Sequence, residues 1–92
     1  MFFYIITYDI PDDRRRKKIA DLLEGYGSRV QYSVFECVLS KGQYEELKKR
    51  LGKIFKTGED SLRFYPLSTH TFSQVEIWGE PPLTLPATSI II

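Results

Sequence analysis

Residues 2–8 read FFYIITY, a run made entirely of aromatic and β-branched side chains. Such a run predicts a central strand that is buried on both faces. Asp9 follows it directly, and Pro11 breaks the strand two residues later. Asp12 can then cap a helix, and Asp13 lies well against the positive end of that helix. We therefore expect a buried strand that ends at Asp9 and leads into a helix.

Two segments carry the apolar spacing of helices. The first predicts a helix from Asp13 to Glu24 with Ile19, Leu22 and Leu23 on one face. Glycines at 25 and 27 end it. The second opens at Ser40 and Gln43, which form a capping-box pattern. Its apolar face consists of Tyr44, Leu47, Leu51, Ile54 and Phe55, and Gly58 closes the segment.

Three further segments have strand composition. RVQYSVFECVL (29–39) is too long for one average strand and predicts two strands, or one bent strand, with a break near Tyr32–Ser33. SLRFYPL (61–67) predicts a fourth strand, and QVEIW (74–78) predicts a short fifth one. The order is β-α-β-β-α-β with an additional C-terminal strand. This is the ferredoxin-like plan, an α+β fold with an antiparallel sheet.

The chain has 92 residues, which is enough for one domain. We expect that domain at residues 1–78 and a Pro- and Thr-rich tail at residues 79–92. A fifth strand has few places in so small a sheet, so the economical option is addition to the sheet edge of a partner in a homodimer. A domain of this size also gains stability from dimerisation.

Composition indicates the cellular compartment in which the protein works. Cys37 is the single cysteine, so no internal disulfide can form. The apolar start lacks the preceding basic residues and the small-residue cleavage site of a signal peptide. No apolar stretch approaches the roughly 20 residues that span a membrane. We therefore expect a cytoplasmic protein without a membrane partner.

Charge is distributed unevenly along the chain although the net charge is only +1. Residues 1–56 carry 12 Lys and Arg against 8 Asp and Glu, a net of +4, whereas residues 57–92 carry 1 against 4, a net of −3. This asymmetry indicates one side that faces a polyanion.

Asp9 is the first candidate for chemistry. A carboxylate at the end of a buried strand is held rigidly and is partly solvated, which suits a Mg²⁺ ligand. The alternative is a solvated strand-end residue or an Asx turn before Pro11. We expect Asp12 and Asp13 to stabilise the start of the helix, so a metal site at Asp9 would lack further carboxylates from the same chain. A two-fold axis near Asp9 would supply a second copy, and a cation would relieve the repulsion between the two.

The run Arg14-Arg15-Arg16-Lys17-Lys18 cannot face one way on a helix. At helical spacing, Arg15 and Arg16 should lie over the sheet end that carries Asp9, where they could pair with Asp9 or reach a phosphate. Arg14, Lys17 and Lys18 should point outward. A solvated helix face is the alternative, although cations at a helix N-terminus oppose its dipole.

Two further groups could contact nucleic acid. Arg29 can grip phosphate, and Ser33 and Phe35 lie nearby on the same predicted strands, where Phe could stack on a base or simply be core. On the second helix, Lys48, Lys49, Arg50, Lys53 and Lys56 form a second basic patch, or a solvated face balanced by Glu45 and Glu46. His70 is alone, so a zinc site is not expected.

Three stretches together resemble the Cas2 family, the small subunit of CRISPR spacer acquisition. They are YDIPDD (8–13) followed by basic residues, GSRVQYSVFE (27–36) and SLRFYPL (61–67). The resemblance implies a ferredoxin-like homodimer whose C-terminal strands extend the partner's sheet, with Mg²⁺ held between two copies of Asp9. It makes residues 1–78 a nuclease and adaptation domain. By motif position, Tyr8, Arg16, Arg29, Ser33 and Phe35 are the helpers of a catalytic Asp9.

The resemblance also implies an activity and a partner. Members of this family are metal-dependent endonucleases on single-stranded RNA or double-stranded DNA, and they act with the CRISPR integrase. We therefore expect a catalytic pair of Asp9 and Tyr8, with nucleic-acid contacts from Arg14, Arg15, Arg16, Lys18, Arg29, Ser33 and Phe35. The alternatives are a non-catalytic DNA scaffold that bridges integrase dimers, and a toxin-like ribonuclease of the same fold that acts on messenger RNA.

Overall fold

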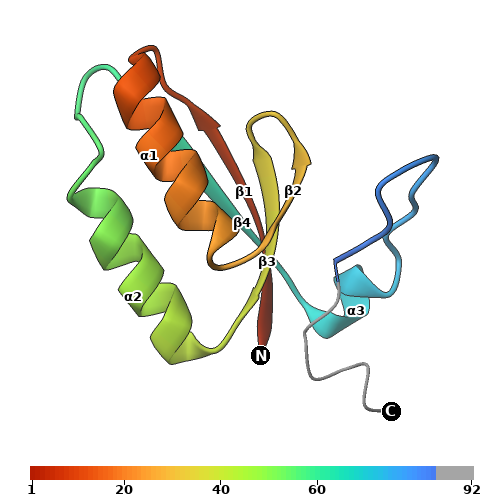
Figure 1. Ribbon diagram of the computed structural model, residues 1–92. Helices are drawn as coiled ribbons and strands as arrows, with labels where there is room; N and C mark the ends of the chain where they lie inside the picture. The colour runs from red at the N-terminus through yellow and green to blue at the C-terminus, as the bar shows by residue number, and fades with distance from the viewer. Residues whose placement is uncertain (85–92) are drawn as a thin grey trace.

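The computed structural model describes residues 1–84. Four strands and three helices follow one another in this part of the chain (Figure 1). Their bounds are β1 Phe2–Asp9, α1 Asp13–Glu24, β2 Ser28–Gln31, β3 Val34–Leu39, α2 Lys41–Gly52, β4 Ser61–Leu67 and α3 Thr69–Phe72. Across residues 1–84 there is no helix with the length and apolar character to cross a membrane.

The strands form one sheet in the order β2-β3-β1-β4, and each neighbouring pair is antiparallel. Figure 1 shows α1 and α2 together on one face of this sheet. The arrangement is the α+β, ferredoxin-like fold that the order of predicted elements indicates. β1 lies between β3 and β4, so the run FFYIITY does occupy a central position.

The core lies between the sheet and the two helices. Successive strand residues point to opposite faces, so every second residue of β1 meets the helices. These residues are Tyr4, Ile6 and Tyr8, all buried. Opposite them on β3 stand Phe35, Cys37 and Leu39, and the helices contribute Ile19, Leu23, Leu47 and Leu51. Strand alternation and helical spacing therefore converge on one apolar layer.

Both predicted helix starts are confirmed. Asp12 caps α1 by accepting a hydrogen bond from the Arg15 backbone N–H at 2.9 Å. Ser40 and Gln43 form the complete capping box of α2, with bonds of 3.1 and 2.8 Å. Side-chain oxygens here satisfy N–H groups that a helix start leaves without partners.

The predicted break within residues 29–39 is also confirmed, because β2 ends at Gln31 and β3 begins at Val34. Gly27, just before β2, has a role that the spacing alone does not show. A Cβ at this position would lie 2.4 Å from Cys37 Sγ and 2.4 Å from the Glu36 carbonyl oxygen. Glycine therefore lets the chain pass directly over β3 as it leaves α1.

The prediction that β1 is buried on both faces is wrong for the single chain. α1 and α2 cover only one face, and the opposite face, called here the open face, keeps partly exposed side chains. The registers place the following residues on it: Ile5, Thr7, Val34, Glu36, Val38, Arg63 and Tyr65. A predominantly apolar strand thus supplies a half-covered surface as well as the core.

The fifth strand predicted at residues 74–78 is absent from the sheet of this chain. A short helix, α3, is capped by Ser68 and precedes this segment instead. Phe72 of α3 packs edge-on against Phe3, with ring centroids 4.9 Å apart. The first part of the tail returns to the open face, where the Thr84 backbone N–H donates to Glu36 Oε1 at 3.0 Å. Residues 85–92, the rest of the predicted tail, lie outside the described residues.

Candidate functional site

Asp9 is the last residue of β1 and lies opposite Ser61 at the start of β4. Strand alternation places it on the side of the open face, with Thr7 and Ile5. Its carboxylate is exposed and, within residues 1–84, makes no hydrogen bond or ion pair. An exposed carboxylate without a partner is free to bind a cation or the partner chain.

Tyr8 points the other way, into the helix-covered side. Its ring is buried, and its hydroxyl donates to the Tyr32 carbonyl oxygen at 3.0 Å. Its backbone N–H donates to the Ser33 carbonyl oxygen at 3.1 Å. Tyr8 therefore holds the turn between β2 and β3, and its hydroxyl is directed away from the side that carries Asp9.

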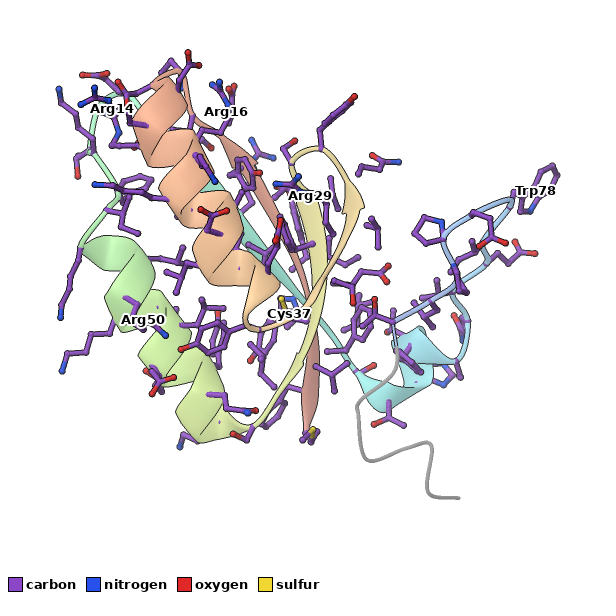
Figure 2. The ribbon with its side chains drawn as sticks, in the orientation of Figure 1. Arg14, Arg16, Arg29, Cys37, Arg50 and Trp78 are labelled. Carbon is purple, nitrogen blue, oxygen red and sulfur yellow. The ribbon has the colours of Figure 1, made fainter. Side chains whose placement is uncertain are left out.

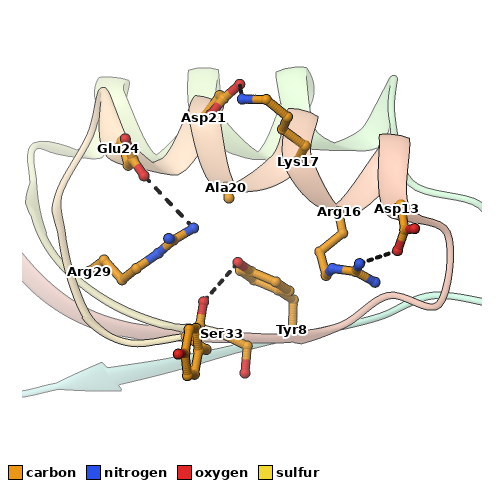
Figure 3. A pocket seen from close by; sticks show the side chains of 10 residues that line it. Tyr8, Asp13, Arg16, Lys17, Ala20, Asp21, Glu24, Arg29 and Ser33 are labelled. Atoms are coloured by element: carbon orange, nitrogen blue, oxygen red, sulfur yellow. Dashed lines mark hydrogen bonds and ion pairs between the residues drawn. The ribbon is translucent and has the colours of Figure 1, made fainter.

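A cleft of about 480 Å³ lies between α1 and the turn that Tyr8 holds (Figure 3). Four predicted site residues line it, namely Tyr8, Arg16, Arg29 and Ser33. Asp9 does not line this cleft. The structure thus brings these four predicted helpers together in one cleft, whereas the Asp9 side chain lies on the opposite side of the sheet.

Each cation in the cleft has a nearby carboxylate (Figure 3). Arg16 pairs with Asp13 and also donates to the Ile10 carbonyl oxygen at 2.9 Å. Arg29 lies 3.7 Å from Glu24, and Lys17 lies 3.0 Å from Asp21. These pairs are exposed, and exposed ion pairs contribute only about 0–1 kcal/mol. A phosphate could therefore replace the carboxylates at little energetic cost.

Phe35 is not available for stacking on a base. Its side chain has 0% exposure and packs beneath Tyr8, with ring centroids 6.3 Å apart. The Arg29 guanidinium carbon lies 5.3 Å from the Phe35 ring centroid. The prediction of a nucleic-acid contact by Phe35 is therefore wrong for this chain, because strand alternation turns the ring into the core. Phe35 instead packs against the Arg29 guanidinium from the core side.

Arg15 does not pair with Asp9, which is one of the two contacts that the sequence suggests for it. Its Nε and Nη2 atoms donate to the two carboxylate oxygens of Asp60 at 2.8 and 2.9 Å. The Asp60 side chain has no exposed surface, and it also accepts the Lys56 backbone N–H at 2.9 Å. The hydrogen bond from Arg15 holds the pKa of Asp60 below its ordinary value of 3.8. Arg15 is thus committed to fastening the loop before β4 onto α1.

Asp60 is the residue that sequence reasoning missed. The signal that could have found it is its position, one residue before the strand that pairs with β1 in an antiparallel sense. Such a residue must lie at the same sheet end as Asp9 and the start of α1. Arg15 and Asp60 therefore fix the distance between the Asp9 strand end and the basic helix.

The remaining predicted contacts are exposed. Arg14 and Arg16 lie in the first turns of α1, near the sheet end that carries Asp9 (Figure 2). Arg14 and Lys18 have no carboxylate within ion-pair distance in the described part of the chain. Cys37, in contrast, lies in the core, where burial raises the pKa of its thiol to about 12. A thiol nucleophile is therefore absent from the described site.

Whether the chain can hold a metal ion depends on which side chains could coordinate it. No group of three or more His, Cys, Asp or Glu side chains that could hold a metal occurs in residues 1–84. Mg²⁺ accepts one or two carboxylates and retains several waters. A single exposed Asp9 therefore fits Mg²⁺ as half of a shared site rather than as a complete one.

Fold and site together define a small ferredoxin-like protein with a basic helix start, a charged cleft and a strand-end carboxylate. The sequence model of the family described as "CRISPR associated protein Cas2" matches residues 1–75. This chain belongs to the Cas2 family.

A curated relative matches the full chain, and solved structures match most of it. The "CRISPR-associated endoribonuclease Cas2 3" of Synechocystis is 73% identical over 92 residues and covers 100% of both chains. The crystal structure of Streptococcus pyogenes Cas2 at pH 6.5 matches with a TM-score of 0.73 and 35% identity, over 84% of this chain and 99% of the other. A chain of a partial Cas6-RT-Cas1–Cas2 complex matches with a TM-score of 0.74 and 36% identity, over 84% and 90%.

Proposed function

We propose that this chain is a Mg²⁺-dependent endonuclease of CRISPR spacer acquisition that works as a homodimer in the cytoplasm. The observation that carries the proposal is the exposed, unpaired Asp9 at the end of β1, beside a half-covered sheet face. The names of relatives support the activity, since they are called endoribonuclease or endonuclease. The substrate is single-stranded RNA or double-stranded DNA.

A second copy of the chain is the natural cover for the open face. Ile5, Val34 and Val38 are only partly buried there, and Tyr65 remains 44% exposed. Two such faces packed around a two-fold axis would bury these side chains. The same axis would bring both copies of Asp9 towards one another, because Asp9 lies at the end of a strand that faces the partner.

Each residue then has a role. The two Asp9 carboxylates would hold the cation, and a bound cation would supply polarisation of the phosphodiester and a lower pKa of the attacking water. Arg16 and Arg29 bind phosphates in the cleft, and Ser33 contributes a hydroxyl. Tyr8 positions the β2–β3 turn rather than touching the reacting atoms. Arg14 and Lys18 attract the polyanion to this end of the molecule.

A scaffold role in the integrase complex is the second candidate. It is favoured by the structural match to a chain in a complex that contains Cas1. That role needs the dimer and its basic surfaces, but it does not need Asp9 chemistry. The two roles are compatible in one protein.

Cleavage assays separate these roles. Single-stranded RNA and duplex DNA are incubated with Mg²⁺ and either wild type, Asp9→Asn or Glu45→Gln. Glu45 is an exposed carboxylate on α2, so Glu45→Gln controls for the loss of one negative charge. We expect Asp9→Asn to abolish cleavage while duplex binding persists, and Glu45→Gln to cleave at the wild-type rate. Cleavage by Asp9→Asn at the wild-type rate would contradict the assignment of the site.

A further inference from the structure

A groove of about 550 Å³ lies between α1 and α2, on the side of the sheet opposite Asp9. Its lining consists of Lys18, Asp21, Leu22, Arg50, Lys53 and Ile54. Asp21 is the one acidic residue in that lining, and its carboxylate is taken by Lys17 at 3.0 Å. The groove, called here the helix groove, is therefore positively charged, shares only Asp21 with the cleft, and lies on the side of the sheet opposite the open face.

Two cations that line the helix groove, Lys18 and Lys53, each follow another cation four residues earlier in the chain. Arg14 and Lys18 stand four residues apart on α1, and Lys49 and Lys53 stand four residues apart at the end of α2. All four are exposed, and none has a carboxylate within 4.0 Å in the described chain. Like charges at this spacing destabilise a helix by about 0.2–0.5 kcal/mol per pair. The helix dipole offsets that cost at the end of α2 but adds to it at the start of α1.

Arg50 also lines the groove and is held in place. Its Nη1 donates to the Tyr26 hydroxyl at 2.9 Å, and its guanidinium lies 5.7 Å from the Tyr26 ring centroid. Tyr26 also donates to Glu46. Figure 2 shows Arg50 on α2. A fixed guanidinium with flexible lysines nearby suits the phosphate backbone of a nucleic acid. Binding to that backbone depends mainly on charge.

We propose that the helix groove is a second nucleic-acid surface, which binds the phosphate backbone of a duplex. A protein partner fits less well, because interfaces between proteins are built around exposed apolar anchors. Leu22 and Ile54, the apolar residues of the groove, pack against the chain's own core. Single strands are bound by exposed aromatic rings. The most exposed rings lie outside the groove lining: Tyr32 is 92% exposed and Trp78 is 93% exposed. Figure 2 shows Trp78 far from α1 and α2.

The position of the groove has a consequence for the dimer of the proposed function, on which this step rests. In a dimer joined through the open faces, both helix layers point outward, so each copy presents its groove to solvent. One dimer would then offer two duplex-binding surfaces that are separate from the shared Asp9 pair. Arg50 and Lys53 belong to the helix groove and not to the Asp9 end, whereas Lys18 serves both, so only α2 residues distinguish the two surfaces.

Duplex binding as a function of salt tests the proposal. The variant Lys49→Gln/Lys53→Gln removes Lys53, which lines the groove, and Lys49, which stands four residues before it. The single variants Lys53→Gln and Lys41→Gln form a matched pair. Lys41 is equally exposed on α2 but lies at its opposite end. Each phosphate contact contributes about 0.9 to the slope of log K against log salt. We expect the double variant to flatten that slope by about 1 to 2, and Lys53→Gln by about 1, whereas Lys41→Gln leaves it unchanged.

Equal slopes for Lys53→Gln and Lys41→Gln would overturn the proposal, even if the double variant binds more weakly. Cleavage of a short single-stranded RNA is measured in parallel. If the slope is unchanged while Asp9→Asn still abolishes cleavage, the helix groove fails and the proposed function stands. If the slope flattens but Asp9→Asn still cleaves, the proposed function fails and the groove stands.

Discussion

The two faces of the sheet are made by the same strands and yet differ in what they do. On the helix-covered face, Ile6 has 0% exposure and belongs to a closed apolar core. On the open face, Ile5 is its direct neighbour in sequence and is only partly buried. The helix-covered face therefore holds the single chain together, whereas the open face leads to Asp9 and leaves apolar side chains partly exposed. The closed core and the exposed strand-end carboxylate thus lie on opposite sides of one strand.

The largest expected effect comes from removing the same side chain on each face. Ile6→Ala should lower the free energy of unfolding by about 2–5 kcal/mol, because a cavity is left in a closed core. Ile5→Ala should cost about 1 kcal/mol or less in the dissociated chain, since less apolar area is lost from partial burial. Urea unfolding at low protein concentration measures both. Equal costs for the two substitutions would contradict the assignment of the core to one face.

The next effect concerns how the chain passes over β3. Gly27→Ala places a Cβ 2.4 Å from Cys37 Sγ, so strand and turn must shift. We expect a loss of about 1–3 kcal/mol, typical of overpacking. Gly42→Ala is the control, because nothing lies within 4 Å of its Cβ position on α2. That change should stabilise the chain by about 0.5–1 kcal/mol, from helix propensity. Thermal melts of both variants check the difference in sign.

The Arg15–Asp60 pair fastens the loop before β4 onto α1 at the sheet end that carries Asp9. The pKa of Asp60 is lowered in the folded chain, so the stability it contributes is present above the ordinary value of 3.8 and is lost as pH falls through the folded-state value. Asp60→Asn should therefore be destabilising at pH 7, with a gap from wild type that closes towards pH 3. Unfolding free energies at the two pH values measure this gap.

A control for that experiment is Asp21→Asn, which removes a carboxylate 58% exposed in its pair with Lys17. Exposed pairs contribute about 0–1 kcal/mol, so this variant should differ little from wild type at either pH. A gap for Asp60→Asn that stays constant from pH 7 to pH 3 would show that the carboxylate charge is not what fastens the loop.

Much of this architecture was predictable because local signals agree with one another. Three features that depend on neighbours in sequence are confirmed. They are the central strand at residues 2–8, the helix caps at Asp12 and Ser40, and the break near Tyr32–Ser33. The α1 bounds of Asp13–Glu24 match the prediction.

What failed depends on long-range packing. Periodicity does not show that only one face of β1 is covered, so a strand buried on both faces was expected. The orientation of Phe35 follows from its register with β1, which places it opposite Ile6. The partner of Arg15 is Asp60, 45 residues away in sequence. The segment 74–78 has strand composition, but it pairs with neither edge strand of this sheet, β2 or β4.

The central claim is that two copies of Asp9, one from each chain, share one metal-dependent site. Wild type and Asp9→Ala are unfolded together, refolded at varied ratios so that subunits pair at random, and assayed for Mg²⁺-dependent cleavage at constant total protein. A shared site requires two wild-type copies, so activity should fall with the square of the wild-type fraction, to about one quarter at equal mixing. A linear fall, to about one half at equal mixing, would contradict the claim, because each chain would then carry a complete site of its own.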